Sequence, residues 1–335
     1  MTQMKTDCGN YEALLLVSFG GPEGMADVIP FLENVLRGRN VPRERMLSVA
    51  RHYEMFGGVS PINQQNRNLI GALAQELEKH GPKLPLYWGN RNWHPLLPDT
   101  LRQMAADGVR NALAFVTSAY SSYSSCRQYR QNLADAQTEV GPTAPHIDKL
   151  RAFYNHPLFI EANVDHIRAA VDKLDKPELV FTAHSIPEAM AANCEYAAQL
   201  QETGRLIAEV LGIERWRMVY QSRSGSPSQP WLGPDIADCL RQIRAEGTSE
   251  VVVAPIGFVS DHMEIVYDLD YEAQNLAQEL GLRMVRAATA GTHPAFVRMI
   301  RELVVERMYS EPARSIGTRG PGHDVCPADC CLPVR

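Results

Sequence analysis

Short apolar runs alternate with helical stretches along the whole chain. Seven runs rich in Val, Ile, Leu and Ala predict β-strands, at residues 13–17, 84–88, 112–116, 179–182, 217–220, 251–254 and 283–287. Between them, apolar residues at helical spacing predict helices, for example over 68–79, 100–106, 159–174 and 236–246. Strands that alternate with helices form parallel sheets covered on both faces. The pattern therefore predicts an α/β fold with parallel sheets flanked by helices.

The order of these segments occurs twice. A strand, a Pro-Asp pair that begins a helix, an acidic residue followed by Gly, and a second strand make up residues 84–116, and residues 217–254 repeat this order. Residues 15–23 also resemble residues 179–188. The sequence therefore predicts two similar lobes, at 1–155 and 156–315, and a tail at 316–335. We expect a ligand to bind in the cleft between the lobes.

Composition narrows the class of protein. The 335 residues are enough for two domains, and 45% hydrophobic with 21% charged residues is ordinary for a globular enzyme. The formal net charge of −6 gives no basic surface for nucleic acid. The N-terminus lacks the apolar core of a signal peptide, and no apolar run approaches the ~20 residues that span a bilayer. We expect a cytoplasmic protein without stable membrane insertion.

Chemically reactive side chains follow two of the predicted strands. His184 comes just after the run 179–182, and Asp261, His262 and Glu264 come after the run 251–254. Ligands of open α/β sheets bind at this edge, where imidazole and carboxylate groups can hold a divalent metal or move protons. The loop after the first strand, Gly20-Gly21-Pro22, lacks the G-x-G-x-x-G pattern, and its proline cannot donate an N–H to a phosphate. Nucleotide binding there is disfavoured.

Five segments in order resemble the ferrochelatase family, whose members insert ferrous iron into a porphyrin. They are residues 15–23, 57–62, 182–187, 221–223 with 230–234, and 260–264. The resemblance implies the chelatase fold, two similar Rossmann-like lobes with the active site in the cleft between them. Residues 18–21 and 56–58 are similar to the actinobacterial branch, which metallates coproporphyrin III. The implied activity is that of a lyase of haem biosynthesis that inserts Fe²⁺ to give coproheme and releases two pyrrole protons.

Three other functions remain open. The chain could metallate protoporphyrin IX instead, or insert a metal such as cobalt into sirohydrochlorin, since that fold is shared. It could also be a two-lobed tetrapyrrole-binding protein without catalytic activity. The sirohydrochlorin enzymes lack the combined Ser-Pro-Ile, Pro-Trp-Leu-Gly-Pro and Asp-His-x-Glu motifs, which this chain has at 60–62, 230–234 and 261–264.

The resemblance also assigns the catalytic residues. His184 and Glu264 are implied as the catalytic pair and as ligands of the Fe²⁺ substrate, on opposite sides of the macrocycle. Which of them takes the pyrrole protons is left open. Phe19 stands where related enzymes place Tyr or Met near the iron, so no axial ligand is expected from that position.

The resemblance places the porphyrin carboxylates near residues 37–60. The implied contacts are Ser60, Tyr129, His52 and Tyr53, with Tyr123 as an alternative to Tyr129. Positive charge in the same segment comes from Arg37, Arg39, Arg45 and Arg51. Residues 51–54 and 63–66 are polar, so no apolar lip for a membrane is expected.

Four carboxylates follow one another at spacings of three, four and four. Asp261, Glu264, Asp268 and Glu272 would form one acidic stripe on a helix. Such a stripe is either a solvated helix face or a path for metal ions or protons. Because it begins at the implied catalytic glutamate, the two interpretations have equal weight.

Cysteines are concentrated near the C-terminus. Of seven, three lie in the last ten residues, and with Cys126 the four thiols Cys126, Cys326, Cys330 and Cys331 match the number that a [2Fe–2S] cluster requires. Some ferrochelatases carry such a cluster on one internal and three C-terminal cysteines, so the resemblance implies it here. Structural zinc or free thiols are the alternatives. No ligand role is expected for Cys8, Cys194 or Cys239.

The expected partners are small. Coproporphyrin III and Fe²⁺ are the implied substrates, with transient contact to the next enzyme of the haem pathway and none to nucleic acid.

Overall fold

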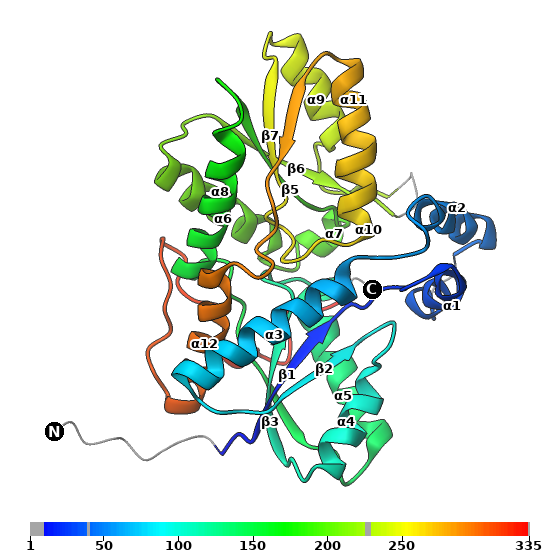
Figure 1. The fold of residues 1–335 in the computed structure, drawn as a ribbon, viewed down its shortest axis with the longest axis vertical. Coiled ribbons are helices and arrows are strands. Elements are labelled where there is room, and N and C mark those ends of the chain that lie inside the picture. The colour runs from blue at the N-terminus through cyan, green and yellow to red at the C-terminus, as the bar shows by residue number, and fades with distance from the viewer. Residues whose placement is uncertain (1–9, 39–40, 225–228, 334–335) are drawn as a thin grey trace, which may run out of the picture. The chain divides into compact units, whose positions relative to one another are not determined.

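The computed structural model describes residues 10–38, 41–224 and 229–333. Figure 1 shows two parallel sheets with helices around each. The first sheet has the strand order β2-β1-β3-β4 and the second the order β6-β5-β7-β8, with every pair parallel. The strands are β1 (Ala13–Ser18), β2 (Leu86–Asn90), β3 (Asn111–Val116), β4 (His146–Lys149), β5 (Glu178–His184), β6 (Trp216–Gln221), β7 (Glu250–Ala254) and β8 (Arg283–Arg286).

Helices connect these strands. The α-helices are α1 (Met25–Val35), α2 (Arg43–Glu54), α3 (Ile62–His80), α4 (Leu97–Ala106), α5 (Gln128–Val140), α6 (Pro157–Val171), α7 (Glu188–Ala191), α8 (Tyr196–Leu211), α9 (Ile236–Ala245), α10 (Met263–Ile265), α11 (Gln274–Glu279) and α12 (Pro294–Tyr309). Two further segments, η1 (Tyr123–Arg127) and η2 (Val266–Ala273), are π-helices.

The predicted fold class and the predicted repeat are confirmed. All seven predicted strands are present, and the two sheets have the same strand order. Sequence analysis missed β4, whose four residues His-Ile-Asp-Lys include only one apolar side chain. This strand lies at the edge of its sheet, where one side needs no pairing and a polar sequence is tolerated.

Contacts group the chain into two compact units. The first contains residues 1–117, 129–150 and 300–312, and the second contains 118–128, 151–299 and 313–335. The internal segment with Cys126 and the C-terminal tail therefore belong to the same unit. The predicted domains at 1–155 and 156–315 remain a prediction.

The core of the first unit lies on one face of its sheet. Alternate residues of β1, among them Leu15 and Val17, pack against Leu97 and Leu101 of α4 and against Leu133 of α5. The intervening β1 residues point to the other face and are also buried. A strand that is buried on both faces has an unbroken apolar sequence, as residues 13–17 do.

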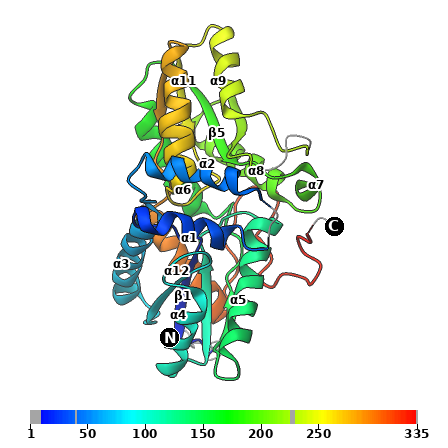
Figure 2. The same cartoon turned by 90° about the vertical axis from the view of Figure 1, so that its right-hand side faces the viewer.

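The second unit is built in the same way. Val180, Val219 and Val253 pack against α9, η2 and α11, and Figure 2 shows α9 and α11 beside β5. On the other face Phe181 is fully buried, and the aromatic ring of Trp216 contacts it edge-on. The sheet is therefore covered on both faces, and its carboxyl edge carries the polar side chains.

The tail follows residues 151–155 of the second unit. The guanidinium of the buried Arg151 donates to the Arg314 carbonyl at 2.9 Å, and Asn155 donates to the Ile316 and Gly320 carbonyls at 3.2 and 2.7 Å. The tail is thus held by hydrogen bonds to its own unit. Among the described residues, no helix is long and apolar enough to cross a membrane.

Gly257 brings the loop after β7 close to β5. Its N–H donates to the Thr182 carbonyl at 3.0 Å, and a Cβ on Gly257 would lie 2.5 Å from the Cα and Cβ of Ala183. We expect Gly257→Ala to lower the free energy of unfolding by about 1–3 kcal/mol, because backbone would have to move. Chemical denaturation measures this change.

Gly71 provides the opposite control. It is exposed inside α3, and a Cβ added there would meet open space. Gly71→Ala should therefore stabilise the protein by about 0.5–1 kcal/mol through helix propensity alone. Equal effects of the two substitutions would contradict the close approach at Gly257.

Candidate functional site

His184 is the last residue of β5. The β5–β6 register ends at the pair His184 and Gln221, and the next amide, Ser185 N–H, donates to the Gln221 carbonyl at 2.8 Å. The His184 carbonyl accepts a hydrogen bond from the hydroxyl of Tyr196 at 3.0 Å. Tyr196 is buried at the start of α8. The end of the strand, and with it the imidazole, is therefore held in place.

Glu264 lies on a short helical turn after β7. His262 begins this turn, because its Nδ1 accepts the Glu264 N–H at 3.2 Å. The Glu264 carbonyl accepts a hydrogen bond from Gln221 Nε2 at 2.8 Å. The backbone N–H and carbonyl of Glu264 thus both have hydrogen-bond partners, which fix the backbone from which its side chain reaches His184.

The two candidate catalytic side chains are in contact. His184 Nδ1 lies 3.3 Å from Glu264 Oε2, an ion-pair distance, although the geometry does not make a regular hydrogen bond. The side chains are 30% and 48% exposed, so solvent reaches both. Burial favours the neutral imidazole, but the Glu264 carboxylate outweighs it and raises the pKa of His184. Burial likewise opposes the charge on Glu264, and the imidazolium outweighs it and lowers the pKa of Glu264 to about 2.

This contact corrects one prediction. His184 and Glu264 were expected on opposite sides of the macrocycle, which would separate their polar atoms by two van der Waals contacts, or about 7 Å. At 3.3 Å no ring fits between them.

Two further carboxylates of the predicted stripe lie on η2. Asp268 accepts a hydrogen bond from the hydroxyl of Ser222, a residue with a left-handed backbone at φ 61° just after β6. Burial, and then the charges of Glu264 and Glu272, raise the pKa of Asp268 to about 7, although the Ser222 hydrogen bond opposes this. The segment is a π-helix rather than the predicted α-helix, and such turns are frequent at functional sites.

Asp261 has a different environment. Its carboxylate is 3.2 Å from both terminal nitrogens of Arg286 and accepts a hydrogen bond from Thr289 at 3.1 Å. Arg286 also pairs with Asp270. The Asp261 charge is therefore neutralised by a half-buried arginine, which favours a structural role over the predicted metal or proton path.

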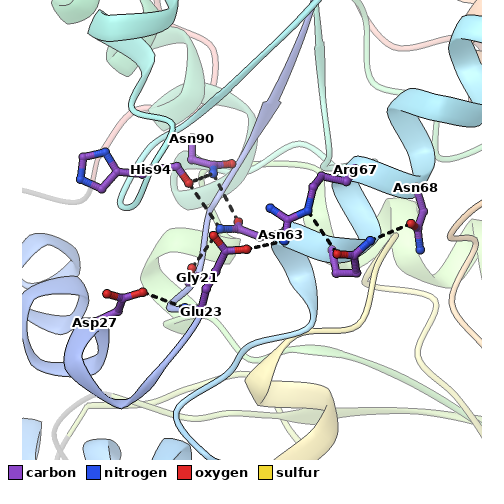
Figure 3. A network of polar contacts seen from close by, with 9 residues as sticks. Gly21, Glu23, Asp27, Asn63, Arg67, Asn68, Asn90 and His94 are labelled. Carbon is purple, nitrogen blue, oxygen red and sulfur yellow. Dashed lines mark hydrogen bonds and ion pairs between the residues drawn. The ribbon is translucent and has the colours of Figure 1, made fainter.

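In the first unit, a buried amide network holds the loop after β1 (Figure 3). Asn63 Nδ2 donates to the Gly21 and His94 carbonyls at 3.1 and 3.3 Å, and Asn90 Nδ2 donates to the His94 carbonyl at 3.0 Å. Arg67 pairs with Glu23 at the edge of the network. Loop 20–23 is thus tied to the start of α3 and to the end of β2.

The predicted carboxylate-binding residues lie in this unit, but most are buried. Ser60 donates its N–H to the Pro22 carbonyl at 2.9 Å, Tyr129 packs in the core beside α4, and Tyr53 contacts the ring of Phe31 edge-on. His52 is half-buried and Arg51 is exposed. Arg39 lies outside the described residues. The alternative to Tyr129, Tyr123, belongs to the second unit.

Sequence analysis missed Arg91. This residue directly follows β2, and its guanidinium carbon lies 4.6 Å from the ring centroid of Tyr129 and 5.5 Å from that of Phe19. Two aromatic rings therefore orient a cation at the carboxyl edge of the sheet. The strand-end rule that identified His184 could have found it.

The first unit also exposes apolar side chains. Met25, Leu47, Val49, Met55 and Val59, on α1, α2 and the loop before α3, are 37–53% exposed. Individual apolar side chains are therefore exposed in the same unit as the polar residues at 51–54 and 63–66, and the expectation of no apolar lip stays a prediction.

The tail brings cysteines together within the second unit. Arg127, next to Cys126, donates to the Ala328 and Cys330 carbonyls at 2.8 and 2.7 Å. The Sγ atoms of Cys330 and Cys331 are 3.6 Å apart, and burial, then Cys330, raises the pKa of Cys331. In the part of the chain that is described, no group of three or more His, Cys, Asp or Glu side chains is arranged to hold a metal ion.

Solved structures define the class. SirB from Bacillus subtilis with Fe³⁺ matches with a TM-score of 0.56 at 9% identity, covering 89% of this chain and 97% of that one. The sirohydrochlorin chelatase SirB from Bacillus subtilis subspecies spizizenii, in complex with cobalt, matches with a TM-score of 0.53 at 10% identity, covering 89% and 95%. The chain has the chelatase fold.

Sequence comparison gives the family. The ferrochelatase family model matches residues 11–308. A ferrochelatase of Rhodopirellula baltica is 56% identical over 96% of this chain and 93% of its own length. The coproporphyrin III ferrochelatases of Streptomyces griseus and Nocardia farcinica are 50% and 49% identical, over 98% and 97% of this chain and 95% and 97% of their own lengths. The chain belongs to the ferrochelatase family.

The raised pKa of Asp268 predicts how stability depends on pH. Between its ordinary value of 3.8 and about 7, the carboxyl is ionised in the unfolded chain and protonated in the folded one. Folding then takes up a proton, so stability falls as pH rises through this window. We expect Asp268→Asn, which cannot ionise, to raise the melting temperature at pH 8 and to change it little at pH 4. A larger gain at pH 4 would contradict the assignment.

Proposed function

We propose that this protein inserts Fe²⁺ into coproporphyrin III to give coproheme, with release of the two pyrrole protons. The contact between His184 and Glu264 carries this proposal. It offers an imidazole and a carboxylate from one direction, and both are partly exposed to a substrate. Fe²⁺ binds both kinds of ligand, and imidazole titrates near neutral pH.

The local charge supports the capture of iron. In the ligand-free pair the Glu264 carboxylate raises the pKa of the His184 imidazole, and the imidazolium lowers the pKa of the carboxylate, so each group favours the charged form of the other. Arrival of Fe²⁺ at Glu264 would repel the imidazolium proton, which leaves a neutral ring to bind iron or to accept a pyrrole proton. Glu264 on α10 and Glu272 on η2 add negative charge that attracts a divalent cation, and Asp268 adds to it above its pKa of about 7.

The preference for coproporphyrin III rests on relatives and on charge. The Streptomyces griseus and Nocardia farcinica relatives are coproporphyrin III ferrochelatases. Four propionates need several donors, and we propose that Ser60, His52, Tyr53 and Tyr129, with Arg91, provide them. Protoporphyrin IX remains the second candidate, because the exposed apolar surface of α1 and α2 suits a membrane-borne substrate.

Anaerobic metallation tests the proposal. Purified protein is mixed with Fe²⁺ and coproporphyrin III, protoporphyrin IX or sirohydrochlorin, and the Soret band is followed. We expect the highest kcat/KM with coproporphyrin III. A higher value with protoporphyrin IX would select the second candidate, and no insertion into any tetrapyrrole would contradict the enzymatic function.

His184→Ala should abolish iron insertion, with kcat reduced at least about 100-fold and the fold retained, because a partly exposed strand-end ring adds little to the core. Glu264→Gln should be nearly as severe, since the amide cannot carry the charge. Circular dichroism checks the fold of both variants. Turnover by His184→Ala at the wild-type rate would show that the imidazole is not the catalytic group.

We propose that the tail holds a [2Fe–2S] cluster through Cys126, Cys326, Cys330 and Cys331. Two sulfur atoms on one tetrahedral metal at about 2.3 Å are about 3.8 Å apart, close to the 3.6 Å between Cys330 and Cys331. The hydrogen bonds of Arg127 bring the tail to the segment of Cys126. A bound cluster would supply a redox-active cross-link between distant parts of the chain.

Colour tests the cluster. Anaerobically purified protein should be reddish-brown, and serine at any of the four positions should remove the colour and lower stability, because the cluster closes a loop of about two hundred residues. Cys239→Ala, on the buried face of α9, should keep the colour, as should Cys194→Ala, whose thiol already donates to the Met190 carbonyl. Colourless protein with one zinc per chain would assign the thiols to zinc.

We also propose that the protein works in the cytoplasm. Transient contact with the next enzyme of the haem pathway stays a prediction.

A further inference from the structure

We propose that Gln221 is a positioning residue that sets the distance between His184 and Glu264. Its backbone belongs to the strand end beside His184, and its side chain holds Glu264. The inference rests on the proposed iron insertion and adds a residue to that site.

Gln221 forms hydrogen bonds with the two segments that carry the catalytic groups. It is the register partner of His184, and its carbonyl accepts the Ser185 N–H at 2.8 Å. Its side-chain Nε2 donates to the Glu264 carbonyl at 2.8 Å. A single residue thus connects the end of β5 to the turn that carries Glu264. The next residue, Ser222, adds a second connection through its hydrogen bond to Asp268.

The remaining contacts of the pair are more local. His262 accepts the Glu264 N–H from within the same turn, which fixes the shape of the turn but not its distance from the sheet. Tyr196 holds the His184 carbonyl and does so from α8. Loss of the Gln221 amide should therefore leave His184 in place and let the Glu264 turn move.

The Gln221 side chain is unusual in being only half satisfied. The residue is 1% exposed, and its Oε1 has no hydrogen-bond partner among the described residues. A buried acceptor without a partner lowers stability. An apolar side chain of similar length would remove this acceptor but would also leave the Glu264 carbonyl without its donor, so the two effects on stability offset each other. A glutamine that the fold does not require points to a functional requirement for its amide donor.

Gln199 offers a matched control in the same unit. It is also buried, but both of its polar atoms are paired, since Oε1 accepts the Ser121 N–H at 2.8 Å and Nε2 donates to the Ser121 hydroxyl at 3.1 Å. Neither of these hydrogen bonds involves the catalytic pair. Methionine at either position removes the side-chain amide. At Gln199 this breaks two hydrogen bonds, and at Gln221 it breaks one.

The experiment compares Gln221→Met, Gln199→Met and wild type in the full-length protein. For Gln221→Met we expect kcat for iron insertion to fall about tenfold, because reacting groups lose their alignment, while KM for the porphyrin changes less than about twofold. Its melting temperature should be unchanged or raised. For Gln199→Met we expect the reverse, a lower melting temperature with kcat within about twofold of wild type.

Gln221→Glu is the second variant, in case methionine disturbs the packing. It keeps the length of the side chain, but once ionised its carboxylate cannot donate to the Glu264 carbonyl, so kcat should fall as well when the pH is high enough to ionise it. Wild-type kcat in both Gln221 variants, or a loss confined to KM, would overturn the inference. A fall in melting temperature like that of Gln199→Met would assign Gln221 a structural role. Failure of the wild type itself to insert iron would instead reject the proposed function.

Discussion

Contact between an imidazole and a carboxylate requires two strand ends to be held at a fixed separation. His184 ends β5, and Glu264 lies on the turn α10 that follows β7, the neighbouring strand of the same sheet; their side chains meet at 3.3 Å. Apolar burial of both strands fixes the register, because a one-residue slip would turn every valine away from its helix. Core packing thereby determines the separation of two polar side chains that are not themselves part of the core.

The same sheet appears twice, but its carboxyl edges carry different chemistry. In the second unit this edge presents His184, Glu264 and Asp268. In the first unit it presents Arg91 between two aromatic rings, beside an uncharged asparagine network. Equal strand orders therefore coexist with different edge residues, so the chemistry of each unit depends on its edge side chains and not on its topology.

Much of this could be predicted from the sequence, and the omissions have physical causes. Apolar runs identified seven strands because these strands are rich in buried side chains, whereas the polar edge strand β4 has no such signal. Residue type and strand position made His184 and Glu264 candidates and the resemblance paired them, but neither gave their contact, since a side-chain distance depends on tertiary structure. The environment of Asp261 was hidden for the same reason, because its partner Arg286 lies 25 residues away in the chain.

Backbone anchoring explains why a site at the edge of a sheet can tolerate internal strain. Burial, and then the like charges of Glu264 and Glu272, raise the pKa of Asp268, and Gln221 keeps an acceptor without a partner among the residues described. Each feature lowers stability, and each lies within the residues that join β6 to η2. The valine-rich core beneath supplies stability that does not depend on the site. Such losses of stability occur where function requires particular charges and hydrogen-bond donors. The residues at the carboxyl edge of the sheet, rather than those of the core, therefore distinguish this protein from others with parallel sheets.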